Sequence, residues 1–236
     1  MRIAVVTPTG DRPGSLARQS HYLERSILPP ETKPHWIVVD DGKNPYSPPA
    51  PQGWYTSYFL RKDQSGCSLV MNLMLGLSHA LTLSPDYVFI WEDDDWYGPD
   101  RIIDQLDYLL RGRPMHGYFN SLYYHVPLQR FKLMPNKTAS LFEMAFTGEL
   151  VEPILDFLSA YDGDGKGLDG KLWRMFSGLK QAPPRKKFTS IGLKGLAGRD
   201  GIGCGHRPDR TYEQDMNYGY LLSLIGQDDL DDILGG

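Results

Sequence analysis

The sequence YVFIWEDDDWYGPDRI, from Tyr87 to Ile102, joins a short apolar run to four acidic residues. Apolar runs of about four to eight residues bounded by polar ones are typical of buried strands, so Tyr87 to Trp91 predicts a strand. The acidic run, Glu92 to Asp95, follows where the chain should leave the sheet. Carboxylates about 4 Å apart repel by roughly 1 kcal/mol in water, and a divalent cation relieves that repulsion. Mg²⁺ and Mn²⁺ favour such oxygen ligands, so the stretch predicts a candidate metal site.

Two other apolar runs end in polar residues in the same way. Ile3 to Thr7 is followed by Pro8 and Thr9, and His35 to Val39 is followed by Asp40 and Asp41. Both runs predict buried strands. A helix can start near Pro13, and leucines at every fourth position predict another over Ser68 to Leu83.

Alternating strands and helices predict an α/β fold with a mostly parallel central sheet flanked by helices. In such sheets ligands bind beyond the carboxyl ends of the strands. We therefore expect Thr7, Asp40 and Asp93 to lie along one edge of the sheet.

The remaining chain is less regular. The proline-rich residues 43–53 predict a surface loop, and residues 118–146 predict mixed or antiparallel strands. Helices are expected at 149–158 and 168–176. We predict one domain over residues 1–225, with a first half at about 1–115 and a second at about 116–225. Residues 226–236, with four aspartates, predict a solvated acidic tail.

The composition narrows the classes of protein that fit. The net charge of −4 gives no broad attraction to nucleic acid or to an anionic membrane. Cys67 and Cys204 are the only cysteines, and they lack the spacing of a zinc site or a disulfide framework. The chain shows no run of about twenty apolar residues and no leader pattern, so we expect a cytoplasmic protein without integral membrane contact.

These motifs, in this order, resemble the inverting family 2 glycosyltransferases, which have the A-type (GT-A) nucleotide-diphospho-sugar transferase fold, a Rossmann-type architecture. The residues that carry the resemblance are VVDDG at 38–42, Arg61 with Gly66-Cys67-Ser68 and Asn72, and the stretch 87–102. Met71 departs from the family pattern, which has an arginine there, and Glu92 stands where an aspartate is usual. The similarity covers roughly residues 2–176, and a mixed segment is expected towards the C-terminus.

The resemblance implies how a donor would bind. Thr7, Pro8, Thr9 and Arg12, with Asp40 or Asp41, would line its base and ribose. Arg61 and Asn72 are further donor contacts, and Asp93 would touch the ribose or the metal. Asp94 is the expected metal ligand, with Asp95 and His206 as further ligands. The implied cofactors are Mn²⁺ or Mg²⁺ and a nucleotide-diphospho-sugar, with a UDP-sugar favoured.

The catalytic base is expected further along the chain. LDGKLW at 168–173 resembles the family motif in which an acidic residue precedes a Leu-Trp pair, and this makes Asp169 the candidate base. A carboxylate at that place would take the proton of an acceptor hydroxyl. Asp162 and Asp164 remain alternatives, and Asp169 could instead favour the start of a helix electrostatically.

The segment IGLKGLAGRDGIGCGHRPDR at 191–210 combines six glycines with basic residues that include Lys194, Arg199 and His206. Glycines allow close approach of the backbone to phosphate, and basic side chains neutralise it, so this segment could cover the donor diphosphate. The excess of basic residues between Lys180 and Arg210 could also meet a polyanionic acceptor, but donor phosphate is favoured over nucleic acid.

The predicted function is metal-dependent transfer of a sugar from a nucleotide-diphosphate donor to an acceptor hydroxyl, with inversion. The acceptor could be a glycan, a protein or a small molecule, with nucleic acid less favoured. A nucleotidyltransferase on a similar fold and a non-catalytic sugar-nucleotide-binding protein remain alternatives. The sequence does not identify the sugar, the acceptor or the oligomeric state.

Overall fold

The computed structural model describes residues 1–63, 65–135, 137–176, 180–181, 187–199, 201 and 206–235. Its strands are β1 (Arg2–Thr9), β2 (Lys33–Asp40), β3 (Tyr55–Leu60), β4 (Tyr87–Ile90), β5 (Trp96–Tyr97), β6 (Met115–His116), β7 (Leu122–His125), β8 (Arg130–Leu133), β9 (Ala145–Thr147), β10 (Lys180–Gln181), β11 (Ser190–Lys194) and β12 (Glu213–Gln214). Its α-helices are α1 (Pro13–Glu24), α2 (Ser68–Leu83), α3 (Arg101–Leu109), α4 (Val151–Ser159), α5 (Leu168–Met175), α6 (Gly219–Ile225) and α7 (Gln227–Gly235). Short 3-10 turns occur at Leu141–Glu143, Gly148–Leu150 and Met216–Tyr218.

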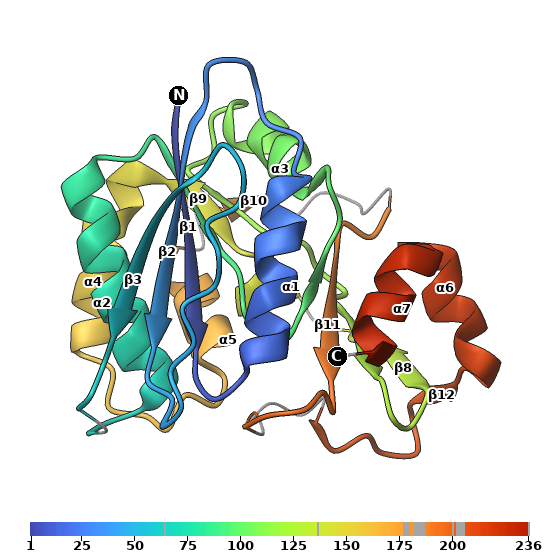
Figure 1. The fold of residues 1–236 in the computed structure, drawn as a ribbon. Coiled ribbons are helices and arrows are strands. Elements are labelled where there is room, and N and C mark those ends of the chain that lie inside the picture. The colour runs from blue at the N-terminus through green and yellow to red at the C-terminus, as the bar shows by residue number, and fades with distance from the viewer. Residues whose placement is uncertain are drawn as a thin grey trace.

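The central sheet has seven strands in the order β10-β6-β9-β4-β1-β2-β3 (Figure 1). β1 pairs in parallel with β2 and β4, and β2 pairs in parallel with β3. The antiparallel strand β9 interrupts this order, because it pairs antiparallel with both β4 and β6. The predicted α/β class with a mostly parallel sheet flanked by helices is confirmed.

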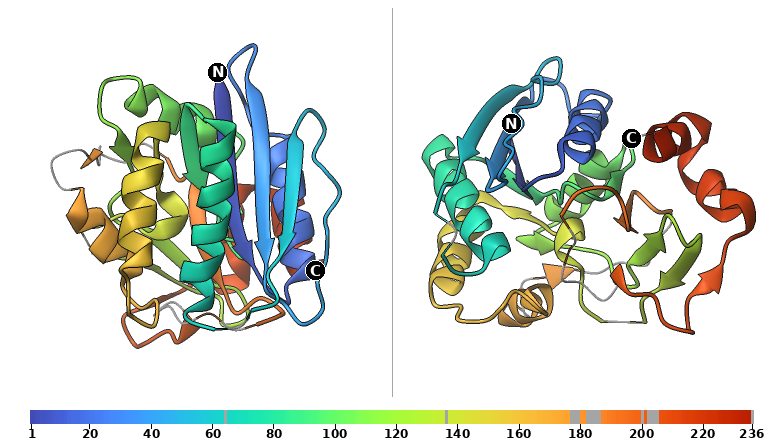
Figure 2. Two further views of the ribbon diagram at one scale, coloured as in Figure 1. Left: turned by 90° about the vertical axis from the view of Figure 1, so that its left-hand side faces the viewer. Right: turned by 60° about the horizontal axis from the view of Figure 1, so that its bottom comes forward.

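The alternation of side chains along β1 explains why helices cover both faces of this sheet. Ile3 and Val5 belong to the hydrophobic core on the side of α1 and α3. Ala4 and Val6 belong to the core on the side of α2, α4 and α5. Figure 2 shows α2 and α4 side by side on that second face. On α2 the buried apolar positions include Val70, Leu73, Leu77 and Ala80.

A second, mixed sheet of five strands lies beside the first, in the order β12-β8-β7-β11-β5. β5 follows the acidic run and pairs antiparallel with β11, while β11 pairs in parallel with β7. The predicted strands within residues 118–146 are therefore confirmed, as is a mixed segment towards the C-terminus. The sequence did not predict β3 or β11.

The expectation of a solvated tail over residues 226–236 is wrong for the described residues, because they form α7. Asp229, Leu230 and Ile233 are buried against the rest of the molecule. Both carboxylate oxygens of Asp229 accept hydrogen bonds from Arg25, at 2.6 and 2.5 Å, and the Trp96 indole N–H donates to Oδ2 at 2.6 Å. Four aspartates suggested solvation, but one of them, Asp229, is buried and accepts hydrogen bonds from Arg25 after α1 and from Trp96 in β5.

Within the part of the chain that the structure describes, no helix combines the length and the apolar character that crossing a membrane requires.

Replacing Asp229 with alanine should destabilise the protein. Removing one partner of a buried ion pair costs about 3–5 kcal/mol, and partial exposure of Arg25 places the expected loss at about 2–3 kcal/mol. Urea denaturation of Asp229→Ala measures this loss. Asp232→Ala, an exposed position on the same helix, is the matched control and should change stability little. Equal stabilities for the two variants would contradict a structural role for α7.

Candidate active site

The acidic run forms a tight loop between β4 and β5 whose backbone is held from two sides. The Gln19 side-chain amide on α1 donates to the carbonyl oxygens of Asp93 and Asp95, at 3.0 and 2.8 Å. The Tyr97 hydroxyl accepts from the Glu92 backbone N–H at 2.7 Å. These contacts fix the backbone of the loop, and its carboxylates have different partners.

Asp93 points towards the loop that follows β1. Its Oδ2 accepts from the Thr9 hydroxyl at 2.6 Å, and its Oδ1 accepts from Arg12 Nη1 at 2.7 Å. Arg12 also lies 3.5 Å from Asp94 Oδ2 and donates from Nε to the Arg199 carbonyl at 2.8 Å. Arg12 therefore links two of the acidic residues to the segment after β11.

Asp94 and Asp95 share the ammonium group of Lys194, the last residue of β11. Lys194 Nζ lies 2.8 Å from Asp95 Oδ1 and 3.4 Å from Asp94 Oδ2. His206 Nε2 lies 4.0 Å from the same Asp94 oxygen. Asp94 thus has three basic neighbours, contributed by three different segments of the chain.

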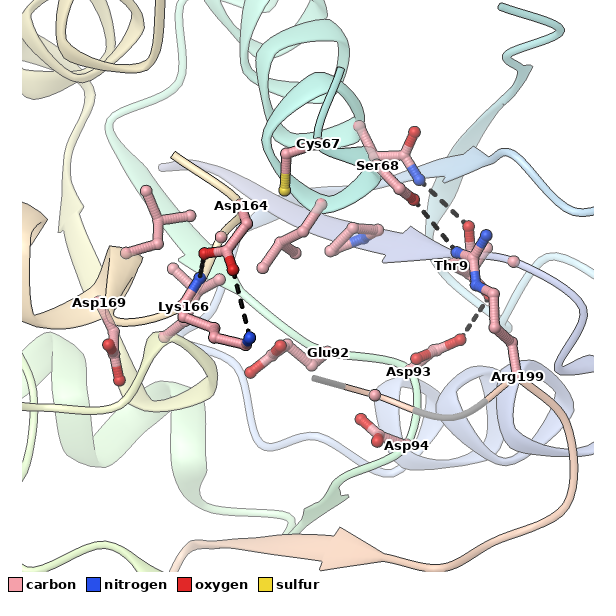
Figure 3. Close-up of a pocket in the computed structure, with 18 of the residues that line it drawn as sticks. Thr9, Cys67, Ser68, Glu92, Asp93, Asp94, Asp164, Lys166, Asp169 and Arg199 are labelled. Carbon is pink, nitrogen blue, oxygen red and sulfur yellow. Dashed lines mark hydrogen bonds and ion pairs between the residues drawn. The ribbon is translucent and has the colours of Figure 1, made fainter. Parts of the chain in front are cut away.

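A cavity of about 960 Å³ opens beside this loop (Figure 3). Its walls come from the β1–α1 connection, the start of α2, the acidic loop, the loop before α5 and the segment after β11. The described residues that line it are Pro8, Thr9, Gly10, Arg12, Gly66, Cys67, Ser68, Leu69, Asn72, Glu92, Asp93, Asp94, Tyr123, Leu141, Gly163, Asp164, Gly165, Lys166, Gly167, Leu168, Asp169, Lys194, Arg199, Gly201 and His206. The carboxyl ends of β1 and β4 thus meet the C-terminal segment around one space.

Burial and nearby charges shift the pKa values of the cavity carboxyls in opposite directions. Burial raises the pKa of Glu92 to about 7, although the Lys194 ammonium opposes this shift. Burial also favours protonation of Asp94, but Lys194 and Arg12 outweigh it and hold its pKa below the ordinary value. Burial would lower the pKa of Lys194, yet Asp94 and Asp95 raise it overall. Asp94 is therefore an anion at neutral pH, and Lys194 is a cation.

Asp41, at the end of β2, forms the centre of a polar cluster beside the cavity. Arg61 Nη2 donates to its Oδ2 at 2.8 Å, and the Ser68 hydroxyl donates to the same oxygen. Arg199 Nη2 donates to its Oδ1 at 2.7 Å. Burial opposes ionisation of Asp41, but these hydrogen bonds hold its pKa below the ordinary value. Through Arg199, this cluster fixes the segment after β11 to the N-terminal half.

Asn72 joins that cluster to the cavity wall. Its Oδ1 accepts from Arg61 Nε at 2.7 Å, and its Nδ2 donates to the Thr9 carbonyl at 3.2 Å.

Asp40 and Thr7 have structural partners instead. The Asp40 carboxylate accepts from the Tyr58 hydroxyl at 2.7 Å and from the backbone N–H groups of Gly42 and Tyr46, at 2.7 and 3.2 Å. Thr7 accepts from the Trp36 indole N–H at 3.0 Å inside the sheet. Both residues stabilise the strand ends that carry the site.

Asp169 is the second residue of α5 and lies on the part of the cavity wall beside the glycine loop at 163–167. Its Oδ1 accepts from the Gly170 backbone N–H at 2.7 Å, and burial raises its pKa above the ordinary value. In the preceding loop, Asp164 also lines the cavity and accepts from the Lys166 backbone N–H at 3.0 Å. Asp162 is exposed and is absent from the described lining.

The structure brings together most of the residues that the sequence predicted. Pro8, Thr9, Arg12, Asn72, Asp93, Asp94, Asp169 and His206 all line the cavity. Thr7, Asp40, Asp41, Arg61 and Asp95 are buried close by but do not belong to its described lining. Cys204 lies outside the described residues.

Sequence reasoning gave no specific role to Ser68 or Arg199, and it did not foresee that Lys194 lies between Asp94 and Asp95. Lys194 ends an apolar alternation, Ile191 and Leu193, that could have indicated a buried strand. The six glycines of the same segment obscured that signal.

Comparison with solved structures shows that the fold is similar to that of S. aureus TarS. The chain is similar to S. aureus TarS, with a TM-score of 0.53 at 14% identity over 82% of this chain and 37% of that one. It is also similar to TarS 1-349 in complex with UDP, with a TM-score of 0.53 at 12% identity over 82% of this chain and 60% of that one. TarS 1-349 in complex with UDP-GlcNAc gives a TM-score of 0.50 at 12% identity over 84% and 60%. The chain thus spans less than two thirds of the length of these proteins.

No family model and no curated protein matches the sequence.

A methyl group at Gly10 should disturb the contact between the two halves. A Cβ at this position would overlap Arg199 Nη2 and Asp41 Oδ1. Overpacking of this kind costs about 1–3 kcal/mol, so Gly10→Ala should lower the free energy of unfolding by that amount. Gly14→Ala is the control, because its Cβ would lie 4.0 Å from its nearest neighbour. Gly14→Ala, in α1, should not lower stability, and a Gly10→Ala protein as stable as wild type in urea denaturation would contradict the close packing.

The raised pKa of Glu92 predicts a pH-dependent difference in stability. The folded protein binds this proton more tightly than the unfolded chain, so the wild type should lose stability relative to Glu92→Gln as pH rises from about 4.5 through about 7. Urea denaturation of both proteins at pH 5 and pH 8 measures the change. A constant difference between the wild type and Glu92→Gln at the two pH values would disprove the raised pKa.

Proposed function

We propose that this chain is a metal-dependent glycosyltransferase that moves a sugar from a nucleotide-diphospho-sugar, with UDP the favoured nucleotide, to an acceptor hydroxyl with inversion. The observation that carries the proposal is the arrangement of one cavity. Arg12, Lys194 and His206 surround Asp94 in its wall. The carboxylate of Asp169 lies apart from Asp94, at another part of the wall (Figure 3). Sugar transfer requires groups that bind the leaving diphosphate at one place and a base for the acceptor hydroxyl at another.

The donor is proposed to bind along the wall that includes Pro8, Thr9 and Asn72. Arg12 lines the same cavity, and its guanidinium is a group that binds phosphate. TarS has been crystallised with UDP and with UDP-GlcNAc, and its fold is similar to that of this chain. These complexes support a UDP-sugar as the first donor to test.

The charges around Asp94 fit a divalent cation. Lys194 and Arg12 keep Asp94 ionised, and its carboxylate lines the cavity, where it is accessible to a divalent cation.

Among the described residues, no three His, Cys, Asp or Glu side chains converge to hold a metal. Asp94 and His206, 4.0 Å apart on the cavity wall, would therefore hold the ion together with diphosphate oxygens. When bound, Mn²⁺ or Mg²⁺ would supply Lewis-acid stabilisation of the leaving diphosphate. Asp95, predicted as a further ligand, contacts Lys194 instead.

In the proposed step Asp169 takes the proton of the acceptor hydroxyl as its oxygen attacks the anomeric carbon. The bond between that carbon and the diphosphate oxygen breaks on the opposite side, so the configuration inverts. Burial raises the pKa of Asp169, which makes its carboxylate a better proton acceptor. Arg12 stays beside the departing diphosphate and offsets its charge.

The direct test is a panel of UDP-, GDP-, CDP- and dTDP-sugars with and without Mn²⁺. Two quantities are measured for each sugar: the shift in the melting temperature of the protein and the release of the nucleoside diphosphate. The proposal would be supported if the sugars of one nucleotide stabilise the protein in a Mn²⁺-dependent way and slowly release their nucleoside diphosphate. Release of pyrophosphate from a nucleoside triphosphate would indicate a nucleotidyltransferase instead, and binding without turnover would indicate a non-catalytic protein.

Asp169→Asn should lower the rate of transfer by about 10²–10⁴-fold, because general-base catalysis contributes that much. The Kd for the nucleotide should stay within about twofold, since the side chain meets the acceptor and not the donor. Asp164→Asn in the neighbouring loop is the matched control, measured by the same transfer assay and by calorimetry. A larger loss in Asp164→Asn than in Asp169→Asn would assign the base to Asp164.

A further inference from the structure

Lys194 is a buried cation that reaches the acidic loop from the other sheet. It is 6% exposed at the end of β11, and its ammonium lies 5.6 Å from the centre of the Tyr123 ring. Its carboxylate neighbours are Asp95 at 2.8 Å and Asp94 at 3.4 Å. A buried charge of this kind is stable only when it is paired, so Lys194 and the acidic loop depend on each other.

The two carboxylates that share Lys194 face different surroundings. The Asp95 side chain is 0% exposed, and its Oδ2 has no hydrogen-bond partner in the described part of the chain. The Asp94 side chain is 9% exposed and lines the cavity with His206. Lys194 therefore lies closer to Asp95 than to Asp94, and Asp94 is the one of the two carboxylates that faces the cavity.

Resting on the function proposed above, we propose that Lys194 is a positioning residue that neutralises Asp95 and leaves Asp94 as the carboxylate for the divalent ion. Two adjacent carboxylates without a cationic partner would bind the ion tightly even in the absence of the donor. With Asp95 paired to Lys194, the protein offers the ion only Asp94 and His206. The ion then gains its remaining oxygen ligands from the diphosphate, so binding of the metal and of the nucleotide should be coupled.

This role makes a distinctive prediction for three variants. In Asp95→Asn the freed ammonium pairs with Asp94 alone, and the Mn²⁺ affinity should fall by about tenfold or more. In Lys194→Met both carboxylates become available, and the Mn²⁺ affinity should rise by about tenfold or more. The double variant Asp95→Asn/Lys194→Met restores the charge balance around Asp94, so its affinity should return to within about threefold of wild type.

The measurement is Mn²⁺ binding by electron paramagnetic resonance, alone and with UDP, on proteins whose folding is checked by circular dichroism. Lys166→Met removes a positive charge from an exposed position on the same cavity and should leave the Mn²⁺ affinity within about twofold. If Lys194→Met does not fold, the comparison of Asp95→Asn with the double variant still decides the question, because the double variant removes one positive and one negative charge together.

The double variant carries the decisive result. If it binds Mn²⁺ as weakly as Asp95→Asn, then Asp95 is itself a ligand and the role of Lys194 is overturned. Unchanged affinity in Lys194→Met, or a wild type that binds no Mn²⁺ with or without UDP, would overturn it as well. If the double variant restores the Mn²⁺ affinity but the wild type transfers no sugar, the role of Lys194 is retained and the transferase proposal is wrong.

Discussion

The pairing of buried acidic residues with cations from distant segments is the constraint on which the rest of the site depends. Asp93, Asp94 and Asp95 are buried at the end of β4, where unpaired carboxylates would be costly. Arg12 reaches them from the loop before α1, and Lys194 reaches them from β11. These contacts require the central sheet, α1 and the mixed sheet to meet at one place. The acidic loop is thus both the candidate site and a contact that joins the two sheets.

The same requirement explains how the segment after β11 is held. Arg199 donates to Asp41 and Ser68, and its carbonyl accepts from Arg12. Each contact crosses from the C-terminal segment to the N-terminal half. The cavity is therefore enclosed by side chains that stabilise one another, which favours a preorganised arrangement of charges. The C-terminal helix α7 adds to this through Asp229, because Trp96 lies next to the acidic run.

The residues in the cavity are suited to different parts of the proposed transfer reaction because their surroundings differ. Lys194 and Arg12 keep Asp94 ionised, whereas burial raises the pKa of Glu92 to about 7. Asp169 lies in a separate part of the wall, at the start of α5, away from Asp94 (Figure 3). Neighbouring carboxyls with opposite shifts in pKa are typical of sites where one group holds charge and another exchanges protons.

The sequence alone determined the strands β1, β2 and β4, the helices α1, α2, α4 and α5, and the place of the acidic run after β4, because apolar periodicity is a local signal. It also indicated residues that line the cavity, among them Arg12 and Asp94. Only the tertiary structure decided which partner each carboxylate has. The edge strand β3, the short strand β11 and the buried face of α7 depend on contacts with distant segments. The sequence alone did not predict these three features. Lys194 lies 100 positions after Asp94, and no local pattern links the two. A buried ion pair is specified by the fold that brings its members together, and for that reason the sequence predicted the acidic run but not the cation that neutralises it.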